Sequence, residues 1–153
     1  MKRFMLPLAA AALSLAAALP ATAGAKTKPA AASAEIISHV KTFDGGNAAI
    51  VQARYVCPEG NHLWVSAKQS ADGAVDPRLE GEGSSQFAAG WLQNHPSNFT
   101  CDGKSHVGKF VVDNSTEYGF GQLRRGVAWV QFCVVSEATE ALILSHSEWV
   151  SVK

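Results

Sequence analysis

The chain has 153 residues, of which 47% are apolar and 17% are charged, and its 13 Lys and Arg residues balance its 13 Asp and Glu residues. This length suits one domain with an apolar core. The neutral balance argues against a general nucleic-acid-binding protein, which carries a basic excess. The apolar and aromatic content argues against a wholly disordered chain. Composition therefore predicts a globular domain without indicating its activity.

The N-terminal segment has the three-part pattern of a secretory signal peptide. A basic start, Met1–Arg3, precedes an apolar run over 4–19. Two small-residue cleavage motifs follow it, Ala21-Thr22-Ala23 and Ala23-Gly24-Ala25. The apolar run is shorter than the about 20 residues that a membrane-spanning helix needs. We therefore expect residues 1–25 to be a signal peptide and the protein to be secreted.

The rest of the chain divides into a tail and one domain. Residues 26–34, which are rich in Ala, Lys and Pro, predict a flexible tail. Residues 35–153 predict a single domain, because they contain no internal repeat and no second periodic block. Since cleavage removes Lys2 and Arg3, the secreted form is expected to be slightly acidic.

Alternation of apolar and polar residues between Gly-, Asn- and Pro-rich turns predicts about seven strands. They are expected over 35–41, 49–57, 62–69, 99–101, 106–113, 127–135 and 141–152. Many short alternating strands favour an all-β fold, an antiparallel sandwich or barrel. The helical spacing of Phe87, Ala88, Trp91 and Leu92 behind a serine allows one short helix near 84–92.

Three cysteines in a secreted chain predict one disulfide and one cysteine outside it. Cys57 and Cys101 each end an expected strand and precede a turn. A bond between them is favoured because it joins strand ends without distorting a core strand. Cys133 lies in mid-strand and is expected to be a buried thiol. The alternative is a Cys57–Cys133 bond between two sheets, as in immunoglobulin domains, and spacing alone leaves the pairing open.

Four short motifs resemble a family of small secreted actinobacterial proteins that carry a domain of unknown function. In chain order they are Tyr55-Val56-Cys57-Pro58-Glu59-Gly60, Val65-Ser66-Ala67-Lys68-Gln69, Cys101-Asp102-Gly103 and Gly126-Val127-Ala128-Trp129-Val130. The resemblance covers residues 45–135, with Ala67 in place of a second valine. It implies an antiparallel immunoglobulin-like sandwich and a bond between Cys57 and Cys101. That family has no established activity, so the resemblance implies no catalytic residue.

Familiar catalytic and metal-binding motifs are missing from the sequence. The five histidines include no pair at helical i, i+4 spacing, and there is no HExxH, GxSxG, phosphate-loop or dinucleotide motif. His146 and Glu148 share one strand face, and we interpret them as part of a polar face. Glu80 and Glu82 lie in a Gly-rich loop, where we expect them to maintain solubility rather than to form a glycosidase pair.

Trp64, Trp129 and Trp149 form the candidate binding surface. Trp64 and Trp129 fall on the strand face opposite the cleaner apolar face, and Trp149 lies near the end of the last strand. Exposed tryptophans can stack on sugars or anchor a protein partner. The alternative, which we favour from sequence, is that they pack under loops or pair across strands.

These observations favour a secreted, non-enzymatic binding module that uses no cofactor or metal and binds neither nucleic acid nor, after cleavage, a membrane. A cell-wall glycan or a secreted protein is its expected ligand. The alternative is an inhibitor of an extracellular hydrolase, with the loop 70–83 as inhibitory segment held by the Cys57–Cys101 bond. An enzymatic function is the least favoured of these hypotheses. It would gain support if two or three of His62, His106 and His146 met a carboxylate in one cleft.

Overall fold

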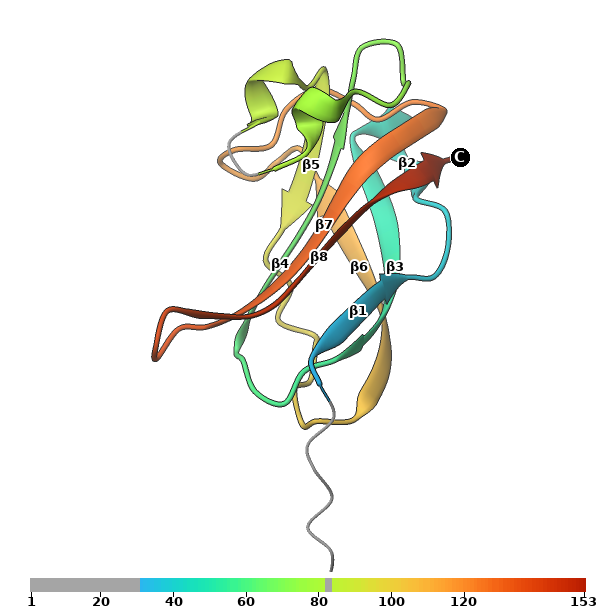
Figure 1. The fold of residues 1–153 in the computed structure, drawn as a ribbon. Helices are drawn as coiled ribbons and strands as arrows, with labels where there is room; N and C mark the ends of the chain where they lie inside the picture. The colour runs from blue at the N-terminus through green and yellow to red at the C-terminus, as the bar shows by residue number, and fades with distance from the viewer. Residues whose placement is uncertain (1–30, 82–83) are drawn as a thin grey trace, which may run out of the picture.

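The computed structural model describes residues 31–81 and 84–153 (Figure 1). The expected signal peptide, and the tail as far as residue 30, lie outside the described residues. The strands are β1 (Ser33–Ile36), β2 (Lys41–Phe43), β3 (Ala48–Val56), β4 (His62–Gln69), β5 (Gly90–Asn94), β6 (Ser105–Asp113), β7 (Gly126–Ser136) and β8 (Ala141–Val152). Three short 3₁₀ turns accompany them, η1 (Asp44–Gly46), η2 (Pro77–Leu79) and η3 (Ser84–Phe87). The described ranges contain no α-helix, and the all-β prediction is confirmed.

The strands form one antiparallel sheet that curls until its ends meet. Their order is β1-β3-β6-β5-β4-β7-β8, with β2 beside β3. Val40, just before β2, pairs in parallel with Val152 near the end of β8. The Val40 N–H donates to the Ser151 carbonyl over 2.9 Å, and the Lys153 N–H donates to the Val40 carbonyl over 3.0 Å. The sheet therefore makes a nearly closed barrel, in which β1 lies next to β8, below it in the view of Figure 1.

Alternation along the strands sorts side chains between the inside and the outside of this barrel. The inner face holds the apolar core, to which β3, β4 and β7 contribute Val51, Ala53, Tyr55, Leu63, Val65, Ala67, Ala128, Val130, Phe132 and Val134. Tyr55, Phe110 and Phe132 contact one another, with ring centroids 5.4 to 6.1 Å apart. Truncating one such ring to alanine costs about 3–5 kcal/mol, so this cluster is a main source of stability.

The predicted bounds agree with the structure where alternation is strong. The ranges 62–69 and 141–152 coincide with β4 and β8, and 127–135 lies within β7. The range 35–41 instead divides into β1, which begins at Ser33, and β2. The predicted strand at 99–101 is wrong, because the Thr100 N–H donates to the Tyr55 hydroxyl over 3.2 Å rather than to a neighbouring strand.

The segment 84–92 is a turn followed by a strand. After η3, the chain enters β5 at Gly90, which pairs with Gln69 of β4. Trp91 is partly exposed and Leu92 is fully buried, the alternation expected of a strand. The apolar spacing of this segment fits a helix, but here it arises from a 3₁₀ turn joined to a strand. The strand, β5, lies between β4 and β6 in the sheet.

Candidate functional site

Cys57 and Cys101 form a disulfide, with their Cα atoms 4.7 Å apart. This confirms the favoured pairing and rules out the Cys57–Cys133 alternative. The turn beside the bond is closed by the Gly103 N–H, which donates to the Cys57 carbonyl over 2.9 Å. Cys133 is buried on β7, with its sulfur 3.6 Å from the hydroxyl oxygen of Ser145.

All four tryptophans lie on the outer surface of β5, β4, β7 and β8, which we call the tryptophan face. Strand register sets its side chains in rows that run across these strands. The first row is Trp91, Lys68, Trp129 and Trp149, and the second is Gln93, Ser66, Gln131 and Ser147. The third row contains Trp64, Cys133 and Ser145. Three tryptophans in one row thus flank a lysine.

The structure brings together two of the three predicted tryptophans. The rings of Trp129 and Trp149 contact each other with centroids 5.4 Å apart at 57°. The Trp149 indole N–H donates to Oε1 of Glu80 over 2.8 Å, so a loop residue engages this ring. Trp64 lies in another row, where its indole N–H donates to Oε1 of Gln93 over 2.9 Å. The predicted surface therefore consists of a Trp129–Trp149 pair and a separate Trp64.

Lys68 holds the segment 70–89 against the first row. Its side chain is only 2% exposed, and burying an ammonium group is costly unless polar partners replace water. Nζ donates to the Gly81 carbonyl over 2.7 Å and to Oγ of Ser84 over 2.6 Å. The Ser84 hydroxyl lies 2.8 Å from the Leu79 carbonyl oxygen. The loop is therefore anchored through a buried cation.

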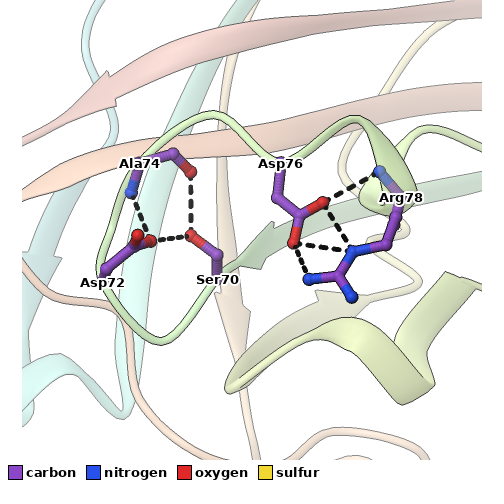
Figure 2. Close-up of polar contacts among 5 residues, drawn as sticks. All are labelled: Ser70, Asp72, Ala74, Asp76 and Arg78. Carbon is purple, nitrogen blue, oxygen red and sulfur yellow. Dashed lines mark hydrogen bonds and ion pairs between the residues drawn. The ribbon is translucent and has the colours of Figure 1, made fainter.

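The first half of this segment is ordered by its own polar contacts (Figure 2). Asp72 accepts from the Ala74 N–H over 3.0 Å and lies 2.8 Å from Oγ of Ser70. These two hydrogen bonds lower the pKa of the Asp72 carboxyl. The Arg78 guanidinium contacts both carboxylate oxygens of Asp76, with a shortest distance of 2.6 Å. Those hydrogen bonds from Arg78 lower the pKa of Asp76.

The disulfide does not hold this loop, contrary to the inhibitor hypothesis. Cys101 lies beside Gly60, before β4 begins, whereas the segment 70–89 starts after β4 ends. The eight residues of β4 separate the two by about 26 Å of extended strand. Glu82, which the sequence interpretation paired with Glu80, lies outside the described residues.

A pocket of about 380 Å³ lies on the tryptophan face beside β4 and β5. It is lined by Trp64, Lys68, Ser85, Trp91, Gln93, His95 and Tyr118. Aromatic walls with a few polar groups are typical of small-molecule sites of roughly 300–1,000 Å³. Of the three predicted tryptophans, only Trp64 lines this pocket.

Two of the aromatic walls, Trp91 and Tyr118, were missed by sequence reasoning. The spacing around Trp91 also allows a short helix, and Tyr118 lies in a turn-rich stretch without periodicity. Trp91 and Phe120 exchange two backbone hydrogen bonds of 2.8 and 2.9 Å, and their rings meet edge to face with centroids 6.2 Å apart. This pairing carries Tyr118, which is 60% exposed, to the pocket. Strand alternation at 90–94 is the sequence signal that could have placed Trp91 in this wall.

Gln93 is the most deeply buried uncharged polar residue of the pocket, at 3% exposure. An indole nitrogen can only donate, so the contact with Trp64 assigns the amide oxygen of Gln93 to that side. The amide nitrogen then lies on the opposite side. Within residues 31–81 and 84–153 it has no hydrogen-bond partner.

A chain of polar contacts lies at one edge of the pocket. Nε2 of His62 is 2.9 Å from Nδ1 of His95, and Nδ1 of His62 is 3.2 Å from Oε1 of Glu137. Burial and the charge of His62 lower the pKa of His95. His95 is therefore neutral at neutral pH.

The other histidines named in the sequence analysis pair with different carboxylates. His106 lies 2.7 Å from Asp102, and His146 lies 2.9 Å from Glu148. The contacts of the described residues therefore join no two of His62, His106 and His146. Across 31–81 and 84–153, no three His, Cys, Asp or Glu side chains are grouped so that they could hold a metal ion.

Comparisons with known proteins leave the pocket as the main guide to function. The chain matches no model of a known protein family, and no curated protein is found to match it. No helix in the part of the chain that the structure describes is long and apolar enough to cross a bilayer. The chemistry of the side chains around the pocket is therefore the basis for a function.

Proposed function

We propose that this protein is an extracellular, non-enzymatic binding module whose ligand occupies the pocket on the tryptophan face. The observation that carries the proposal is the grouping of three aromatic rings, those of Trp64, Trp91 and Tyr118, around the buried amide of Gln93. Rigid rings present a large contact area at low entropic cost, and one placed polar group orients the ligand.

Three features support an extracellular location. The first 25 residues have the signal-peptide pattern. The Cys57–Cys101 disulfide is of the kind that persists in oxidising compartments. The motifs of residues 45–135 resemble small secreted actinobacterial proteins, and we propose membership of that family. Secretion would present the pocket to cell-wall glycans and to other extracellular molecules.

A non-enzymatic role fits the use of the histidine–carboxylate pairs. Glu148, the partner of His146, also accepts the Ile36 N–H over 3.0 Å and so ties β1 to β8. Asp102, the partner of His106, accepts the Lys104 N–H over 3.0 Å in the turn beside the disulfide. These carboxylates stabilise turns and the seam of the barrel, so we assign them a structural role.

The proposal is tested by retention on extracellular material. Residues 26–153 and the double variant Trp64→Ala/Trp91→Ala are incubated with washed cell walls and, separately, with purified secreted proteins. We expect the double variant to be retained at least about tenfold more weakly, because it loses two ring contacts. Leu142→Ala is the matched control, since Leu142 is an exposed apolar residue of β8 outside the pocket.

Two results would contradict the proposal. Equal retention of the wild type and the double variant would show that the pocket is not the binding site. Inhibition of a protease or lysozyme panel that survives the double substitution would favour the inhibitor alternative. Circular dichroism of each variant confirms that any loss of retention is not a loss of folding.

A further inference from the structure

We infer that the ligand of this pocket is a neutral glycan, one pyranose ring of which lies between Trp64, Trp91 and Tyr118. The inference rests on the proposed function, because it names the ligand class of the same pocket. It is carried by two observations: the aromatic walls and the amide nitrogen of Gln93, which has no partner within the described part of the chain.

The aromatic walls match the apolar faces of a pyranose. An aromatic ring has an electron-rich face that attracts the weakly positive C–H groups of a sugar. Trp91 is held edge-on by Phe120 and Trp64 by its hydrogen bond to Gln93, so two of the three rings are fixed before a ligand arrives. Such preorganisation reduces the entropy lost on binding.

The buried amide of Gln93 selects for an oxygen-rich ligand. Its oxygen accepts from Trp64, and its nitrogen lacks an acceptor within the described part of the chain. Because this nitrogen is not among the buried side-chain atoms that lack a partner, it is accessible from the pocket and can donate to a ligand acceptor. Hydroxyl and ring oxygens of a sugar are such acceptors, whereas a purely apolar ligand provides none.

The charges around the pocket favour a neutral sugar. Lys68 directs its ammonium group to Gly81 and Ser84, and His95 faces His62. None of the described lining residues is a carboxylate. The ammonium group of Lys68 and the neutral ring of His95 are thus both engaged within the protein, and hydroxyl groups are the ligand groups that the remaining described lining can bind.

The size of the pocket favours one ring over a peptide segment. Its volume of about 380 Å³ is near the lower end of small-molecule pockets. Tyr118 is 60% exposed, so it forms an open rim past which the next sugar residues can continue into solvent. The glycan is therefore bound by one residue and extends away from the sheet.

The test is calorimetric titration of residues 26–153 with cellotetraose, xylotetraose, maltotetraose and chitotetraose, with tryptophan fluorescence as a second readout. We expect at least one tetrasaccharide to bind and to quench fluorescence. Trp91→Ala should weaken that binding about tenfold or more. Gln93→Glu, which keeps the oxygen toward Trp64 and replaces the donor by an acceptor, should weaken it about fivefold or more.

The outcomes separate this inference from the proposed function. The protein could be retained on extracellular proteins through Trp64 and Trp91 and yet bind none of the tetrasaccharides. That result would overturn the inference of a glycan ligand but would leave the proposed binding function intact. Equal binding of an oligoglucuronate and a neutral tetrasaccharide would overturn the preference for a neutral sugar. Leu142→Ala should bind as the wild type does, and thermal melting of every variant shows whether it folds.

Discussion

Trp64 of β4 donates its indole N–H to the amide oxygen of Gln93 of β5 over 2.9 Å, and both side chains line the same pocket. The two strands are neighbours in the sheet, so backbone pairing brings the two groups together. One contact fixes both an aromatic wall and the direction of the amide. It therefore links the stability of the sheet to the geometry of the pocket.

The variant Trp64→Phe separates these two roles. It keeps a ring in the wall and removes the donor, which leaves the buried amide oxygen of Gln93 without its partner. We expect a loss of about 1–3 kcal/mol in the free energy of unfolding and weaker glycan binding, because the amide is no longer oriented. Urea unfolding and calorimetric titration measure the two effects. Unchanged values for both would show that the contact neither stabilises the sheet nor orients the amide for binding.

Lys68→Met tests how the loop 70–89 is anchored. Methionine fills a similar volume but cannot donate to Gly81 and Ser84, which now accept from Nζ. We expect faster amide hydrogen exchange over 77–89 and little change in β3, since local opening follows the loss of local contacts. Ser84→Ala, which removes the hydroxyl acceptor of Lys68, should give an intermediate effect. Uniform acceleration across the barrel would instead indicate global destabilisation.

The double variant Cys57→Ala/Cys101→Ala tests the disulfide. The bond closes a loop of 44 residues, for which the chain-entropy relation gives about 4 kcal/mol of stabilisation. We expect a correspondingly lower melting temperature. The wild type treated with a reducing agent should melt as the double variant does. Cys133→Ala is the control. A larger loss of melting temperature in Cys133→Ala than in the double variant would show that the buried thiol contributes more to stability than the disulfide does.

Stability should depend on pH through His95. Its pKa is lowered from 6.5 by burial and by His62, so the folded protein resists a proton that the unfolded chain accepts. The stabilisation is complete above about pH 6.5 and is lost as the pH falls through the folded pKa. The carboxyls with lowered pKa values lose their contribution only below about 3.8; they are Asp72, Asp76 and Asp102.

Urea unfolding at pH 5 and pH 7.5 checks this dependence. His62→Gln removes a positive charge next to His95. This variant should therefore show a smaller difference in the free energy of unfolding between pH 5 and pH 7.5. A difference that His95→Gln leaves intact would assign the effect to another group.

The sequence predicts the strands best where one face is purely apolar. In β7, Ala128, Val130, Phe132 and Val134 are all buried, and a shift of one residue would turn every one of them away from the core. The pattern therefore fixes both the strand and its inward face. The disulfide was predicted for a similar reason, since both cysteines lie at strand ends where the chain turns.

The pocket was harder to predict, because it depends on pairing between distant residues. Trp91 reaches it through register with Lys68 and through the bridge to Phe120, neither of which leaves a local pattern. Tyr118 is placed by the same bridge. Trp64 could be assigned to the outer face from alternation alone, but its partner Gln93 lies 29 residues away.

The seam between Val40 and Val152 also determines how the barrel would bear mechanical load. These segments run in parallel, so a pull on the two chain ends slides one past the other along their length. The hydrogen bonds of Val40, Thr42 and Lys153 across the seam would then be strained together instead of opening one after another. A protein tethered at one end and pulled at the other would resist such a force in shear.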